Sequence, residues 1–199
     1  MYRVFYLEKL KKALTKLPSI GEKSAERITF FLLSNKEVAT EIAEAIKDAT
    51  EHVKFCNKCH AFSEEELCEI CRDPSREKVL CVVEKPEDVI LLERVLGKKW
   101  YYHITGGVLS PINNKTPETL YIHDIPKRVK EEGFKEVVLA LPPTVEGDTT
   151  GYYIRNLLKE HNLNVKITRI SRGIPRGSDL SFQDGQTLKE ALEERKELT

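Results

Sequence analysis

Four of the five cysteines lie within sixteen residues and form two C-x2-C pairs, at Cys56, Cys59, Cys68 and Cys71. A C-x2-C turn aims two thiolates at one point, and two such turns complete the tetrahedron that Zn2+ prefers. Four thiolates leave no coordination position open to water, so the spacing predicts one structural zinc ion per chain. His60 is a weaker alternative ligand, and two disulfides or two redox pairs are the competing interpretation.

The fifth cysteine, Cys81, lies in the apolar run of residues 79–83, and we expect it to be an inert, buried strand residue. No apolar run approaches the roughly 20 residues that a membrane span needs, and the N-terminal residues lack the pattern of a signal peptide. We therefore expect a cytoplasmic protein with no membrane partner. Such a compartment is reducing, which favours cysteines that hold zinc over disulfides.

The segment before the cysteines is predicted to form a helix-hairpin-helix. Apolar residues recur every three or four positions over residues 2–16 and again over residues 37–53, which indicates amphipathic helices whose apolar faces form a core or a subunit interface. Pro18 disfavours helical geometry at the residue before it, and we expect Gly21 to provide a tight turn with a positive φ. Ala25 follows, where a small side chain lets the second helix approach the first.

Two basic residues, Lys23 and Arg27, lie four apart and therefore share one face of the second helix beside the hairpin. Backbone N–H groups at the start of a helix, together with the helix dipole, favour a phosphate. The first 27 residues hold seven basic and three acidic residues, although the whole chain has a net charge of zero. We predict that Lys23 and Arg27 contact the DNA backbone without reading bases; a hairpin that serves only packing is the alternative.

The segment after the cysteines alternates between apolar strands and amphipathic helices. Strands are expected over residues 78–84, 101–105, 136–140 and 165–170. Continuous apolar strands separated by helices indicate a parallel sheet covered on both faces. Sites in such sheets lie at the carboxyl ends of the strands, where Glu84 and residues 142–148 would fall.

This arrangement resembles the Toprim domain of topoisomerases, primases and some nucleases. The resemblance lies in the strand that ends in Glu84, the Gly106–Gly107 turn and the acid-bearing loop after the third strand. Active members carry a glutamate after the first strand and D-x-D after the third, and these acids hold Mg2+ for phosphoryl transfer. Pro142 and Thr144 stand where the two aspartates would be. The resemblance therefore implies a retained scaffold that has lost the reaction.

Three acids remain near the expected strand ends, Glu84, Glu146 and Asp148, and they leave open a weak Mg2+ site. A Mg2+-dependent Toprim nuclease or primase-like enzyme that uses them is the alternative function. A zinc-stabilised interaction module without DNA contact is a third hypothesis.

The order of a helix-hairpin-helix, a four-cysteine module and a Toprim-like sheet resembles the RecR family of bacterial recombination mediators. The stretches L-P-x-I-G-x-K-S-A-x-R, V-V-E, G-G-x-L-S-P and P-T-V-E-G support the resemblance over the whole chain. It implies a non-catalytic protein that acts with RecO and RecF to load RecA onto gapped single-stranded DNA. It also implies self-association, from a homodimer to a homotetrameric ring that encircles single- or double-stranded DNA in the nucleoid.

Residue roles follow from the same resemblance. Lys23 and Arg27 would face DNA inside the ring. Glu84, Asp88 and Glu146 would line an acidic patch that meets RecO or a weakly bound Mg2+ ion.

The predicted fold class is α+β and multidomain. Its parts are a helix-hairpin-helix domain (residues 1–55), a four-cysteine zinc finger (56–73), a Toprim-like α/β parallel-sheet domain (78–172) and a C-terminal Walker B-like segment (173–199). The chain contains no G-x4-G-K-[ST] loop, so ATP hydrolysis is not expected. We interpret the basic loop of residues 169–180 and a last helix over 187–195 as a subunit or partner contact.

Overall fold

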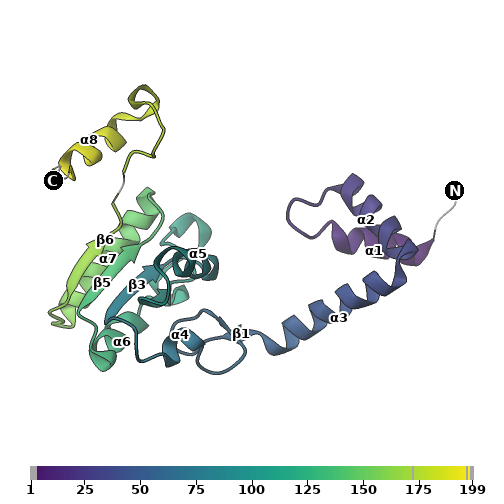
Figure 1. Cartoon of the computed structure of the whole chain (residues 1–199), viewed down its shortest axis with the longest axis horizontal. Helices are drawn as coiled ribbons and strands as arrows, with labels where there is room; N and C mark the ends of the chain where they lie inside the picture. The colour runs from purple at the N-terminus through teal and green to yellow at the C-terminus, as the bar shows by residue number, and fades with distance from the viewer. Residues whose placement is uncertain (1–3, 172, 196, 198–199) are drawn as a thin grey trace. The chain divides into compact units, whose positions relative to one another are not determined.

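The computed structural model describes residues 4–171, 173–195 and 197. The chain divides after Val53 into two separately packed units, and Figure 1 labels the eight α-helices and most of the strands that the described residues form. The second unit holds the four cysteines, the parallel sheet and the C-terminal segment, so three of the predicted parts share one unit. None of the described helices is long and apolar enough to cross a membrane.

The first unit consists of three helices, α1 (Phe5–Leu14), α2 (Glu22–Ser34) and α3 (Lys36–His52). Its buried residues are Ala25 and Thr29, both on α2, and the Thr29 hydroxyl donates to the Ala25 carbonyl at 2.8 Å. No residue of α3 is buried. The predicted apolar stripe of α3 is therefore not core within this chain, and it remains open to a partner.

The turn between α1 and α2 differs from the prediction for Gly21. Gly21 has a φ of −81° and a ψ of 173°, the extended geometry usual for the residue that precedes a helix. The positive φ falls instead on Ser19, at +64°, directly after Pro18. The prediction was wrong because Gly21 serves as the N-cap of α2, and the left-handed step occurs two residues earlier.

The second unit begins with the four-cysteine stretch, which forms a small finger. Strands β1 (Lys54–Phe55) and β2 (Phe62–Ser63) pair antiparallel, and the short helix α4 (Glu69–Arg72) follows. The rings of Phe55 and Phe62 stack across this pair with their centroids 5.5 Å apart.

A four-stranded parallel sheet forms the centre of the second unit. Its strands are β3 (Val79–Val83), β4 (Tyr101–Ile104), β5 (Glu136–Ala140) and β6 (Lys166–Arg169), in the order β4-β3-β5-β6. Each observed strand lies within one residue of the predicted bounds, and all three pairings are parallel. The order makes β3 and β5 neighbours, so their carboxyl ends lie side by side.

Helices and short 3-10 turns connect the strands, because parallel neighbours need crossover connections. They are α5 (Pro86–Leu96), η1 (Pro111–Asn113), η2 (Pro117–Thr119), α6 (Asp124–Glu132) and α7 (Val145–Glu160), and the chain continues after β6 through η3 (Leu180–Phe182) and α8 (Gly185–Glu193). The last predicted helix is confirmed as α8.

The two faces of the sheet bury different clusters. One face packs against α6 and α7, through residues that include Leu80, Val82, Val137, Ile125 and Leu158. Along β3 the intervening residues, Cys81 and Val83, point to the other face, as alternation along a strand requires. That face packs against Val89 of α5 and against three of the finger cysteines. The finger is thus part of the hydrophobic core of the sheet.

Candidate metal centre and DNA-binding residues

The four finger cysteines converge on one point. Their sulfur atoms all lie within 4.8 Å of one another, and those of Cys59 and Cys68 are 3.4 Å apart. Tetrahedral zinc with Zn–S bonds of about 2.3 Å spaces its sulfur ligands roughly 3.8 Å apart, so the cluster fits the ion. Among the described residues this is the one group of three or more cysteine, histidine or carboxylate side chains arranged to hold a metal. His60, the weaker alternative ligand, is not part of it.

Backbone hydrogen bonds form the first knuckle. The Cys56 N–H donates to the Ala61 carbonyl at 2.8 Å, and the His60 N–H donates to the Cys56 carbonyl at 3.0 Å. His60 takes a positive φ of 63°, which turns the chain back after Cys59. The N–H of Cys68 then donates to the Cys56 sulfur at 3.3 Å and ties the second knuckle to the first.

The sulfur cluster favours a thiolate before any metal binds. Hydrogen bonds from the thiols of Cys59, Cys68 and Cys71 hold the pKa of Cys56 well below its ordinary value. All five cysteines are free thiols rather than disulfides. The chemistry is that of a closed four-sulfur site, which holds zinc for structure and leaves no position for a reacting water.

Cys81 and His103 are among the titratable groups buried in the sheet, and burial disfavours the charged form of each. Burial raises the pKa of Cys81 to about 12, in agreement with its predicted role as an inert strand residue. Burial also lowers the pKa of His103 to about 3, while its Nε2 contacts the Tyr121 carbonyl at 2.5 Å. Neither group adds a charge beneath the finger at neutral pH.

The three acids predicted to form a patch have different surroundings. Glu84 directly follows β3 and is half-buried, whereas Glu146 in the first turn of α7 is exposed. The Asp88 carboxylate accepts from the Lys85 N–H at 2.9 Å and so caps the start of α5. Among the described residues no group of three acids is arranged to hold a metal. The shared RecO or Mg2+ role of these acids therefore stays a prediction.

The positions matched to the missing D-x-D have a structural task. Thr144 is the N-cap of α7, and its hydroxyl oxygen accepts from the Gly147 N–H at 3.1 Å. The Thr144 N–H donates to the Pro142 carbonyl at 2.8 Å. The loop after β5 is thus organised around the start of a helix rather than around an ion.

Lys23 and Arg27 are both exposed in the first two turns of α2. No side chain caps this end of the helix. The structure therefore places both residues as predicted, on an accessible helix surface next to uncapped backbone N–H groups.

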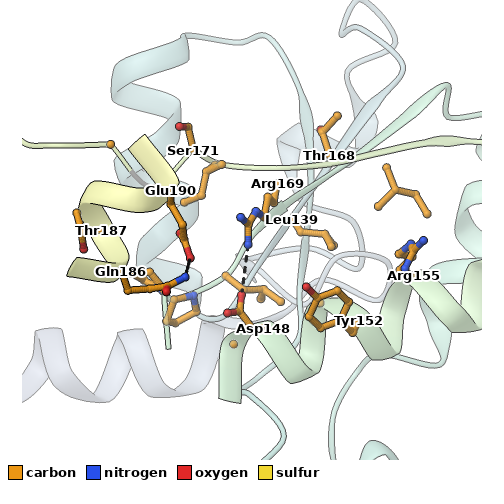
Figure 2. Close-up of a pocket in the computed structure, with 18 of the residues that line it drawn as sticks. Leu139, Asp148, Tyr152, Arg155, Thr168, Arg169, Ser171, Gln186, Thr187 and Glu190 are labelled. Atoms are coloured by element: carbon orange, nitrogen blue, oxygen red, sulfur yellow. Dashed lines mark hydrogen bonds and ion pairs between the residues drawn. The ribbon is translucent and has the colours of Figure 1, made fainter. Parts of the chain in front are cut away.

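A cavity of about 670 Å³ lies where β5, β6, α7 and the C-terminal segment meet. Figure 2 shows Arg169 of β6 reaching toward Asp148 of α7, and the two are 3.9 Å apart. Arg169 also lies 3.5 Å from Glu194, which follows α8. The second of these ion pairs links the residue after α8 to β6. The predicted partner contact of this segment stays a prediction, and residue 172 of the basic loop lies outside the described residues.

Comparison with known proteins covers nearly the whole chain. The chain is 45% identical over 194 residues to the Recombination protein RecR of Rippkaea orientalis, with 96% of this chain and 97% of that protein aligned. It is 40% identical to the protein of the same name from Geobacter sulfurreducens, with 96% of each chain aligned. The chain belongs to the RecR family.

Three family models match successive parts of this RecR chain. The RecR helix-hairpin-helix model matches residues 7–50, the RecR four-cysteine zinc finger model matches residues 53–73, and the Toprim domain model matches residues 78–171. These matches confirm the predicted fold class and the zinc site.

Sequence reasoning about this RecR chain missed the residues that surround the zinc site. His60 stacks on Tyr121 with the ring centroids 3.7 Å apart, and α6 supplies Asp124, Arg128 and Glu132 to the finger. Asp124, Arg128 and Glu132 are spaced four residues apart, and this spacing indicates that they share one face of a helix. Nothing in the sequence indicated that this face meets the finger.

Proposed function

We propose that this chain is a non-catalytic DNA-binding mediator of recombinational repair. Its relatives carry the name Recombination protein RecR, and its N-terminal unit matches the helix-hairpin-helix of that family. The observation that carries the DNA contact is the pair Lys23 and Arg27, exposed on one face of α2 next to its uncapped N-terminus. Such a surface binds phosphates through charge and backbone N–H groups, without base readout.

The lost D-x-D supports the non-catalytic part of the proposal. Pro142 offers no side-chain ligand, and the Thr144 oxygen is engaged by the N–H of Gly147. A sheet that cannot hold Mg2+ firmly lacks the means to stabilise charge in phosphoryl transfer. We propose that its carboxyl edge serves partners instead, with Glu84, Asp88 and Glu146 facing RecO. Together with RecO and RecF, the protein would load RecA onto gapped single-stranded DNA.

Self-association is supported by the apolar surface of the first unit. Ile42 and Ile46 on α3 are 43% and 61% exposed, and Phe30 and Phe31 on α2 are also exposed. Exposed apolar side chains on two neighbouring helices favour an interaction site over plain solvent exposure. We propose that it joins copies of the chain, from a homodimer to a ring-shaped homotetramer around DNA.

The double variant Lys23→Ala/Arg27→Ala tests the DNA contact. We expect weaker binding to gapped DNA, on the order of tenfold at physiological salt, and a salt slope that falls by about 1 for each phosphate that is no longer neutralised. Fluorescence anisotropy over a salt series measures both. With Mg2+ present, the same labelled DNA should remain intact.

The variant Lys130→Ala/Lys159→Ala is the matched control, because it removes two exposed cations from the second unit. It should bind DNA like the wild type. Equal affinity and equal salt slope for the Lys23/Arg27 variant would show the hairpin assignment to be wrong. Cleavage that disappears in Glu84→Gln would favour the nuclease alternative.

The variant Ile42→Glu/Ile46→Glu tests the assembly surface. Buried charges without partners are costly, so the assembly should dissociate and its mass, measured by mass photometry, should fall to half or less. Ile112→Glu is the control, because Ile112 is 94% exposed on η1 and belongs to the second unit. If both variants keep the wild-type mass, α3 does not join the copies.

A further inference from the structure

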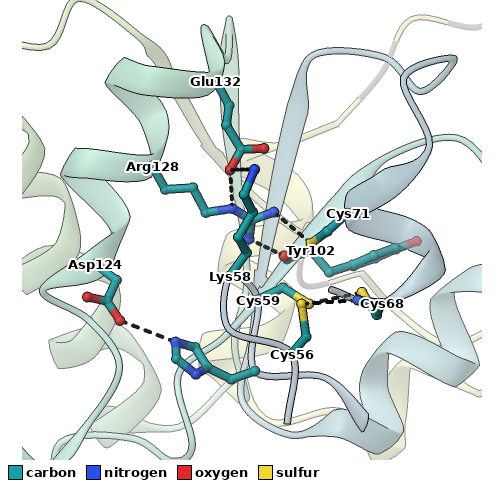
Figure 3. Close-up of polar contacts among 10 residues, drawn as sticks. Cys56, Lys58, Cys59, Cys68, Cys71, Tyr102, Asp124, Arg128 and Glu132 are labelled. Carbon is teal, nitrogen blue, oxygen red and sulfur yellow. Dashed lines mark hydrogen bonds and ion pairs between the residues drawn. The ribbon is translucent and has the colours of Figure 1, made fainter. Parts of the chain in front are cut away.

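One face of α6 meets the zinc finger along its whole length. Asp124, Arg128 and Glu132 lie four residues apart and so stack on the same side of the helix. Figure 3 shows each of them directed at the finger. Asp124 lies 3.2 Å from His60 Nε2, and Glu132 lies 3.7 Å from Lys58 Nζ. The middle member of the row, Arg128, contacts one of the metal ligands, Cys71.

The guanidinium of Arg128 is fixed on three sides. Its Nη2 donates to the Cys71 sulfur at 3.4 Å, its Nη1 donates to the Tyr102 carbonyl at 2.5 Å, and its Nε donates to Glu132 at 2.9 Å (Figure 3). The residue is only 5% exposed. A planar guanidinium held by a strand carbonyl and a carboxylate keeps its remaining N–H groups aimed in one direction. Here that direction is toward a zinc ligand.

Charge balance explains why a cation belongs in this place. Four thiolates around one Zn2+ carry a net charge of −2. Arg128 is the buried cation that contacts this cluster, while the Glu132 carboxylate is shared between Arg128 and the exposed Lys58. Buried charges are almost never left unpaired, so the arginine and the metal centre stabilise each other.

Cys71, the ligand that Arg128 contacts, is less buried than the other three ligands. Cys56, Cys59 and Cys68 are buried, whereas Cys71 is half-buried. Cys71 is therefore the most exposed of the four ligand residues.

We propose that Arg128 is a positioning residue of the zinc centre, which donates a hydrogen bond to the Cys71 thiolate and controls how tightly the ion is held. Because Arg128 belongs to α6, zinc retention is also coupled to the packing of the Toprim domain. Partners of this kind around a metal site typically change metal affinity by about 10- to 100-fold when they are removed.

Two substitutions test the proposal. Arg128→Met keeps an unbranched apolar side chain of similar bulk to the arginine stem and removes the charge and all side-chain N–H groups. Arg128→Lys keeps the charge but loses the planar fork. We expect zinc affinity, measured by competition with a chromogenic chelator, to fall about 10- to 100-fold in Arg128→Met and by a smaller factor in Arg128→Lys. In the cobalt-substituted protein, the sulfur-to-metal charge-transfer band should move to longer wavelength, because a thiolate without its hydrogen bond is a better electron donor.

Arg76→Met is the matched control. Arg76 is an equally buried arginine in the same unit, 6% exposed, and it bonds Glu93 and the Trp100 carbonyl. Its loss should lower the melting temperature but leave zinc affinity and the cobalt band unchanged. An unchanged band and wild-type zinc affinity in Arg128→Met would overturn the proposal. If Arg128→Met does not fold, zinc affinity and the cobalt band are measured on Arg128→Lys instead, and wild-type values for both would overturn the proposal.

Discussion

Removal of zinc is expected to unfold one face of the sheet and not only the finger. Cys56, Cys59 and Cys68 share a buried cluster with Cys81 of β3 and with residues of β4 and α5. Structural zinc contributes about 10–16 kcal/mol of apparent binding free energy in small zinc-finger peptides. If only about 4 kcal/mol of this stabilises the unit, the loss lowers its melting temperature by about 8–16 °C.

The measurement pairs thermal unfolding with cysteine alkylation, on protein with zinc and after chelation, and on Cys68→Ser. In the metal-free protein, alkylation should reach the four ligands and also Cys81, which lies beneath them. Cys81→Ala is the control, because it should retain zinc and lose much less stability. A chelated protein that melts like the zinc-bound one, with Cys56 and Cys71 freely alkylated, would show that the metal does not stabilise this unit.

The second large effect is expected from Gly147→Ala. A Cβ atom at Gly147 would lie 2.0 Å from the Pro142 carbonyl oxygen, which belongs to the backbone and cannot rotate away. The loop after β5 or the first turn of α7 must therefore move, and the bond from the Gly147 N–H to Thr144 is lost with it. A lost cap costs about 1 kcal/mol, and forced repacking costs about 1–3 kcal/mol.

We therefore expect Gly147→Ala to destabilise the protein by about 3 kcal/mol, which lowers the melting temperature by about 6–12 °C. Gly151→Ala, one turn later in α7, is the matched control. Its Cβ would make an ordinary contact of 3.4 Å with Leu139, and alanine has a better helix propensity than glycine. The test is to compare the melting temperatures of the two variants by thermal denaturation. Similar melting temperatures for Gly147→Ala and Gly151→Ala would contradict the predicted clash.

The features predicted best from the sequence depend on local pattern. The zinc ligands follow from the spacing of two C-x2-C pairs, and the strands follow from apolar runs bounded by turns. Both signals are contained within about twenty residues, so no knowledge of distant contacts is needed. The helices α1 and α3 were predicted for the same reason.

The features that were missed depend on contacts between distant segments. Arg128 lies 57 residues after Cys71 in the sequence. The sequence around Arg128, Asp124 and Glu132 shows a charged helix face but does not indicate which part of the protein this face contacts. Gly21 was misjudged for a related reason, because a glycine next to a helix serves equally as an N-cap or as a left-handed turn. In the structure the left-handed step falls on Ser19, directly after Pro18, and this leaves Gly21 as the N-cap of α2. The role of Thr144 as a cap could not be read before the start of α7 was known.

The cap at Thr144 affects how easily this fold could change its chemistry. Aspartate caps a helix as well as threonine does, so an acid could replace Thr144 without weakening α7. The backbone carbonyl of Pro142 lies against Gly147 and accepts the N–H of Thr144, and any residue at position 142 would supply the same carbonyl. These two contacts therefore do not select the side chain at position 142. The stricter position in this loop is Gly147, because a Cβ atom there would meet that carbonyl. Acids could thus enter on either side of residue 143 only as long as the glycine at 147 is kept.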